Sequence, residues 1–83
     1  MPDDIINLNE DQIRAYPSPS TNDVTLENLA IDQVLHIYTA LGDLIFKLIP
    51  GESQERIDVS EFPSGIYYLQ QGSERKGKLI VLR

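Results

Sequence analysis

The chain has 83 residues, with seven lysines and arginines, thirteen aspartates and glutamates, and no cysteine. This length corresponds to one small domain, and the lack of cysteine excludes disulfide bonds, thiolate metal sites and cysteine nucleophiles. The net charge of −6 argues against non-specific nucleic-acid binding, which requires a basic surface, and no apolar run approaches the ~20 residues of a transmembrane segment.

Residues 1–12 are acidic and supply few core-forming side chains, so we interpret them as a linker or a loosely held lead-in. The start, Met1–Asp4, has neither the basic region nor the apolar region of a secretion signal. Two alternatives follow. Either the protein stays in the cytosol, or the chain is the tail of a longer exported protein. The folded domain is expected over residues 13–83.

Short apolar or alternating segments, separated by turn residues, then follow along the chain. The first, Ile13–Tyr16, is stopped by Pro17 and Pro19, which cannot donate to a strand ladder, so we expect a sheet edge or a crossover between sheets here. Gly42 is expected at the left-handed position of a hairpin that joins the third and fourth segments. The remaining strands are predicted at residues 24–29, 33–38, 44–49, 56–59, 65–70 and 76–83.

No apolar pattern in the sequence repeats at helical spacing, and the turns recur at near-regular intervals. The sequence therefore predicts an all-β fold, a seven-stranded antiparallel immunoglobulin-like β-sandwich. Its most strongly specified stretch is the corner Glu61–Gly65, where Pro63 fixes its own φ and Gly65 can adopt conformations closed to other residues. Phe62 stands inside this polar corner, and we expect it to fold inward and close one end of the core.

The residue pattern predicts no active site and no cofactor. His36 is the only histidine, and it lies in a predicted strand without the partners that a catalytic base or a metal site requires. Asp58 and Glu61 flank Ser60, which indicates a turn role. Four tyrosines could form a platform for a sugar, but Tyr67 and Tyr68 are adjacent in a strand and must face opposite sides of the sheet.

Charge is distributed unevenly along the chain. Residues 1–35 carry seven acids and one base, whereas residues 74–83 carry four bases and one acid. A basic terminal strand could be recognised by an acidic partner or by addition of a strand to its edge. Alternatively, its lysines only protect an edge strand against aggregation.

Four motifs in order resemble a known family. Residues 16–19, Tyr-Pro-Ser-Pro, resemble its opening Tyr-Pro-Asn-Pro, with Ser18 in place of the usual Asn. Residues 37–45 resemble its central hairpin and contain Tyr38 and Gly42, with Asp43 where a neutral or basic residue is common. Residues 57–67 resemble its Gly-apolar-Tyr corner, and residues 78–83 its basic, apolar, basic ending. The family is the type A C-terminal sorting domain of the type IX, or Por, secretion system of Gram-negative bacteria.

The resemblance implies a seven-stranded sandwich at the C-terminus of a larger cargo, to which residues 1–12 would connect it. It further implies an upstream Sec signal, transit through the periplasm, recognition by the outer-membrane translocon, and cleavage by a sortase-like peptidase, with cargo released or held at the cell surface. The recognition candidates carried over are Gly65, Tyr67, Lys78 and Arg83. The structural motif positions are Tyr16, Pro17, Pro19, Tyr38, Gly42 and Phe62.

One alternative stays open beside this resemblance. An immunoglobulin- or fibronectin-like spacer or adhesion module, which could bind carbohydrate, would have the same strand pattern and no sorting function. Both interpretations are non-enzymatic, and neither involves a metal.

Overall fold

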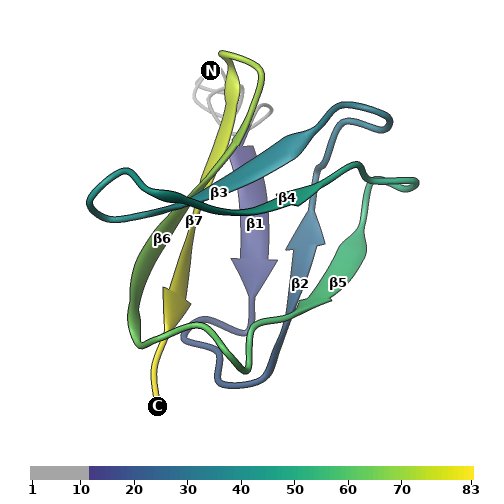
Figure 1. Ribbon diagram of the computed structural model, residues 1–83. Helices are drawn as coiled ribbons and strands as arrows, with labels where there is room; N and C mark the ends of the chain where they lie inside the picture. Colours follow the sequence, from purple (N-terminus) through teal and green to yellow (C-terminus); the bar gives the residue numbers. More distant parts are fainter. Residues whose placement is uncertain (1–11) are drawn as a thin grey trace, which may run out of the picture.

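The computed structural model describes residues 12–83, and Figure 1 shows their seven strands coloured along the chain. Within these residues there is no helix that could cross a membrane. The predicted lead-in over residues 1–12 lies outside the described part except for Gln12, which begins the first strand. The strands are β1 (Gln12–Tyr16), β2 (Asp23–Glu27), β3 (Leu35–Thr39), β4 (Leu44–Leu48), β5 (Glu55–Asp58), β6 (Gly65–Gln71) and β7 (Arg75–Val81).

The strands form one mixed sheet in the order β4-β3-β6-β7-β1-β2-β5. The predicted seven-stranded all-β fold is therefore confirmed. Neighbouring strands are antiparallel except for β1 and β7, which run parallel through the pairs Gln12–Lys76 and Ile13–Gly77. The second half of β1 leaves β7 and pairs with β2, so β1 crosses between two parts of the sheet. This is the crossover that the two prolines after Ile13–Tyr16 predicted.

A single core joins the two parts of the sheet. Alternation decides which side chains enter it: in β3, for example, Leu35 and Ile37 are buried whereas His36 between them is half-exposed. Because strands from both ends of the sheet order contribute, the sheet must curve so that its parts face each other across this core. The buried hydrophobic residues are Ile13, Val24, Leu26, Leu29, Leu35, Ile37, Ile57, Val59, Tyr67, Leu69, Leu79 and Val81.

The terminal strand β7 lies inside the sheet, between β6 and β1 (Figure 1). Beyond β1 the chain returns to β7 at Ser20, whose amide donates to the Ile80 carbonyl at 2.9 Å and whose carbonyl accepts from the Leu82 amide at 3.0 Å. The edge strands are β4 and β5. The expectations that β7 is an edge protected by its lysines, or open to strand addition, are therefore wrong. Alternating lysines showed that one face of β7 is exposed, but they carried no information about its neighbours.

The hairpin between β3 and β4 has the predicted geometry. Gly42 has a φ of 97°, and its amide donates to the Thr39 carbonyl at 2.9 Å, while the Thr39 amide donates to the Asp43 carbonyl at 2.8 Å. Positive φ favours glycine at this position because it has no Cβ. A register shift after Ile37 marks a bulge between β3 and β4. A bulge on an edge strand discourages pairing with another chain.

Candidate recognition site

The corner between β5 and β6 is held to the core by an aromatic cluster. The ring of Phe62 packs against Phe46, with centroids 6.2 Å apart, and against Tyr67, with centroids 5.2 Å apart. Phe62 is half-buried and packs against the core cluster. Its amide donates to the Val59 carbonyl at 3.0 Å, which closes the turn. The prediction that Phe62 closes one end of the core is confirmed.

Tyr67, a predicted recognition residue, is buried with 4% of its surface exposed. Its hydroxyl donates a hydrogen bond to the Pro63 carbonyl within the corner. The next residue, Tyr68, faces the other side of the sheet and is 46% exposed. The two tyrosines therefore occupy opposite faces, as their adjacency in a strand predicted. Tyr67 fixes the corner from the inside, where a partner has no direct access to it.

Gly65 begins β6 with a φ of 157°, a backbone conformation that residues with side chains rarely adopt. It is exposed, and a Cβ at this position would meet no atom within 4 Å. Gly65 lines an apolar groove of about 350 Å³ between the corner and the β3–β4 hairpin, to which Leu41, Ile45 and Ile66 contribute. The positive φ of Gly65 sets the direction in which the chain enters β6, and its lack of a side chain leaves one wall of the groove open.

Arg83 is bound to the corner by its guanidinium group. Nε and Nη2 donate to the Phe62 carbonyl at 2.9 and 2.7 Å, and further hydrogen bonds reach the carbonyls of Val59 and Thr21. The Arg83 amide donates to the Ser64 hydroxyl at 3.0 Å. Hydrogen bonds with a charged donor are stronger than neutral ones. Arg83 therefore holds the corner at Val59 and Phe62 against the β1–β2 loop at Thr21.

Lys78, the fourth predicted recognition residue, lies apart from the corner. It is exposed on β7, where it pairs in register with Tyr68 of β6. Residues directly opposite in an antiparallel pair share one face of the sheet, so Lys78 stands beside Tyr68 on the outer face. The structure brings Gly65, Tyr67 and Arg83 together around the corner and places Lys78 on this separate surface.

A turn carboxylate next to the corner has a lowered pKa. The Ser60 amide donates to Asp58 Oδ1 at 2.8 Å, and the Ser60 hydroxyl also donates to the Asp58 carboxylate. These two hydrogen bonds hold the pKa of Asp58 below its ordinary 3.8. The Arg83 charge acts in the same direction with a smaller effect. Hydrogen bonds stabilise the ionised carboxylate because it is the better acceptor. The turn role predicted around Ser60 is confirmed.

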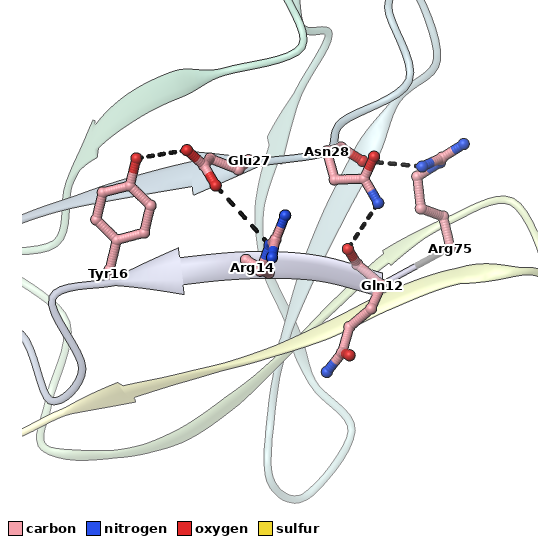
Figure 2. A network of polar contacts seen from close by, with 6 residues as sticks. All are labelled: Gln12, Arg14, Tyr16, Glu27, Asn28 and Arg75. Atoms are coloured by element: carbon pink, nitrogen blue, oxygen red, sulfur yellow. Dashed lines mark hydrogen bonds and ion pairs between the residues drawn. The ribbon is translucent and has the colours of Figure 1, made fainter. Parts of the chain in front are cut away.

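A polar network on the outside of β1 and β2 begins at Tyr16 (Figure 2). The Tyr16 hydroxyl donates to Glu27 Oε2 at 2.7 Å, and Arg14 Nε lies 3.8 Å from Glu27 Oε1. The hydrogen bond to Glu27 raises the pKa of Tyr16 above its ordinary 10.0, since it favours the protonated phenol. An exposed pair such as Arg14 and Glu27 contributes little to stability. The Tyr16 bond is the shorter of these two side-chain contacts and adds to the backbone pairing that joins β1 to β2.

The same network continues to β7 (Figure 2). Asn28 Nδ2 donates to the Gln12 carbonyl at 2.8 Å, and Arg75 Nη1 donates to the Asn28 carbonyl at 3.0 Å. Asn28 has a φ of 68°, which asparagine tolerates better than most residues. Three strands, β1, β2 and β7, are thus connected at the place where β1 changes partners.

Among residues 12–83 no three histidine, cysteine, aspartate or glutamate side chains are grouped so that they could hold a metal ion. The candidate site is a protein surface whose β5–β6 corner is held in place by aromatic packing and hydrogen bonds. Residues 14–82 match the model of the family described as the secretion system C-terminal sorting domain. The chain belongs to this family. The resemblance that its motifs indicated is thereby confirmed. Neither the curated proteins nor the solved structures contain a match to this chain.

The structural motif positions of the sorting domain have identifiable local roles. Tyr16 and Pro17, and Ser18 and Pro19, are joined by cis peptide bonds. Tyr38 lies on the outer face in register with Tyr68, and its ring stacks on His36, with centroids 6.0 Å apart and an angle of 24° between the planes. Family membership implies export across the outer membrane to the cell surface or the extracellular space, in association with a cargo and the type IX machinery.

Two residues with a structural role in the sorting domain, Gln71 and Gly77, were not predicted from the sequence. Gln71 is 1% exposed, and its side chain makes three hydrogen bonds to the β2–β3 loop: one accepted from the Ala30 amide at 2.8 Å, and two donated to the Ala30 and Gln33 carbonyls at 2.9 and 2.7 Å. Gly77 allows the close approach of β1. A glycine inside a strand is a known sign of such contact, and the alternation of β6, continued past Tyr67 and Leu69, places Gln71 on the core face.

Proposed function

We propose that this domain is the address by which a larger cargo protein is exported, and that the type IX translocon recognises it in its folded state. The observation that carries the proposal is the family match over residues 14–82. In this proposal, the cargo reaches the periplasm through an upstream Sec signal and then crosses the outer membrane. A sortase-like peptidase removes the domain afterwards, and the cargo is released or attached to the cell surface.

The four recognition candidates have two different tasks in this proposal. Lys78 is exposed and touches the translocon directly, because its ammonium group is available on the outer face. Gly65, Tyr67 and Arg83 act through the shape of the corner, since Tyr67 is 4% exposed and the Arg83 guanidinium is already hydrogen-bonded to three carbonyls. Recognition would then depend on a correctly folded corner as well as on an exposed base.

An export assay tests this function. Residues 1–83 are fused behind a Sec-targeted fluorescent protein and expressed in a host that has the type IX apparatus and in a strain that lacks the translocon. We expect the reporter in the medium or on the surface of the first strain, and in the periplasm of the second. Reporter retained in the periplasm of both strains, with the domain shown to be folded, would contradict the proposal and favour the spacer or adhesion module.

The two tasks are separated by two substitutions. Lys78→Glu should reduce export and leave the thermal midpoint of unfolding within a few degrees of wild type, because surface substitutions seldom change stability by more than about 0.5 kcal/mol. Arg83→Glu should reduce both, since three backbone carbonyls lose their charged donor. Full export of Lys78→Glu would show that Lys78 does not touch the translocon.

A further inference from the structure

The outer face of β3, β6 and β7 combines aromatic, aliphatic and basic side chains in three rows of paired residues. The register aligns Tyr38, Tyr68 and Lys78 across the three strands, and it aligns Ile66 with Ile80 next to them. Opposed residues of antiparallel strands share a face, so both rows lie on the side away from the core. With Lys76, which pairs with Gln70 in a third row, we name this surface the tyrosine face: Tyr38, Ile66, Tyr68, Lys76, Lys78 and Ile80.

The centre of the tyrosine face is apolar and accessible. Tyr68 is 46% exposed and Ile66 is 41% exposed, and Leu44, which pairs with Tyr38 from β4, is 46% exposed. The apolar groove beside the corner adjoins this centre, because Ile66 lines both. A contiguous apolar surface bordered by polar groups is typical of a protein-binding site. Scattered single apolar residues would carry no such meaning.

The border of the tyrosine face is basic. Strands β3, β4, β6 and β7 carry Lys47, Lys76 and Lys78 on this face and contain no aspartate or glutamate. Carboxylates occur only in the turns that join these strands, at Asp43 and Glu74. The strands of the other part differ in this respect, since β2 and β5 carry Asp23, Glu27, Glu55 and Asp58. A chain with a net charge of −6 thus keeps one face free of strand carboxylates.

We propose that the tyrosine face docks onto an acidic protein surface during export, with apolar side chains of the partner against Tyr68 and Ile66 and carboxylates opposite Lys76 and Lys78. This inference rests on the proposed sorting function and identifies the surface and the chemistry of its partner. An apolar aromatic centre within a polar rim is the usual anatomy of a protein interface. Charge complementarity at the rim selects the partner and speeds the encounter.

The test uses exposed residues with matched controls outside the tyrosine face. Tyr68→Ala removes the most exposed ring of the face, and its control is Ile31→Ala, because Ile31 is an apolar side chain that is 56% exposed in the β2–β3 loop. Lys78→Glu reverses a charge at the rim, and its control is Arg56→Glu, an exposed base on β5. Each variant is expressed as the full chain behind the Sec-targeted reporter, and the purified chains are compared by thermal unfolding.

We expect Tyr68→Ala to lower the exported fraction about tenfold, as loss of a central interface residue does. Lys78→Glu should also lower it, because it reverses a charge at the rim, while Ile31→Ala and Arg56→Glu export as wild type does. Lys78→Arg should restore export because it keeps the charge. Wild-type export together with undiminished export of both face variants would overturn this inference and the direct contact of Lys78, while the sorting function itself would stand. Equal losses in the controls would also overturn it. Wild-type reporter confined to the periplasm would refute the sorting function and, with it, the docking role.

A photo-crosslinking amino acid in place of Tyr68 identifies the class of partner. We expect a translocon-dependent adduct that is digested by protease and whose linked peptide is rich in aspartate and glutamate. The same amino acid in place of Ile31 should give no such adduct. A protease-resistant adduct that contains carbohydrate would overturn the protein partner and assign the tyrosine face to glycan binding.

Discussion

Replacement of Gly77 by alanine should separate β1 from β7. A Cβ at Gly77 would lie 2.4 Å from the Ile13 carbonyl oxygen and 2.9 Å from Ile13 Cβ. The first of these atoms is backbone in the parallel pair that Ile13 forms with Gly77, so no change of rotamer can relieve the clash. Strand β1 must move, although it is the strand that joins the two parts of the sheet.

The size of the effect follows from three contributions. Alanine is intrinsically better than glycine in a strand by roughly 0.5–1 kcal/mol, which acts against the clash. Overpacking of a well-packed position costs about 1–3 kcal/mol. Ile13 is 1% exposed, and partial loss of its burial takes away some of the roughly 1.5–3 kcal/mol that a fully buried aliphatic side chain contributes. We expect the free energy of unfolding to fall by about 2 kcal/mol, or roughly 8–16 °C in Tm for a domain of this size.

Urea unfolding of the full chain measures this loss, and Gly51→Ala is the matched control. A Cβ at Gly51 would meet no atom within 4 Å, so this variant should stay within about 0.5 kcal/mol of wild type. Hydrogen exchange provides a local readout, in which the amides of β1 should lose protection before those of β3 and β6. A decrease below about 0.5 kcal/mol in Gly77→Ala, or unchanged exchange in β1, would refute the close parallel contact.

Three further predictions concern polar contacts. Gln71→Leu leaves three backbone groups of the β2–β3 loop without the partners they have in part-buried bonds, so urea unfolding should show a loss of about 1–3 kcal/mol; a loss below about 0.5 kcal/mol would contradict this role. The pKa of Tyr16 is raised by its bond to Glu27. This bond therefore stabilises the fold at pH values below the ordinary tyrosine pKa, and the stabilisation is lost as the pH rises through the pKa of Tyr16 in the folded protein. Tyr16→Phe should therefore flatten the decline of Tm between about pH 9 and 11, and an unchanged decline would count against it. The pKa of Asp58 is lowered by Ser60, so its stabilisation is present above the unfolded pKa and disappears as pH falls through the folded value. The Tm of Asp58→Asn should fall less than the Tm of wild type between about pH 5 and 2. Equal decreases in the two proteins would show that the ionised Asp58 does not stabilise the fold.

The strands and the turns that separate them could be predicted from local sequence patterns. Alternating apolar residues predicted the strands because one face of each must be buried. The positions of Gly42 and Phe62 followed from local chemistry, since a hairpin turn requires positive φ and an aromatic side chain in a polar corner is most stable when it folds inward. The motifs around these residues also sufficed to identify the family.

Which strands are neighbours is a property of the folded chain and could not be predicted from these patterns. That β7 is an interior strand depends on its pairing with β1, a segment more than sixty residues earlier in the chain, and alternation within a strand carries no information about its partner. The same limit applies to Arg83, whose basic character suggested an exposed contact but whose guanidinium meets three carbonyls that long-range folding brings together. Likewise, Tyr38, Tyr68 and Lys78 become one surface through register alone. Local physical chemistry fixes each strand and its buried face, whereas the sites between strands exist only after the chain has folded.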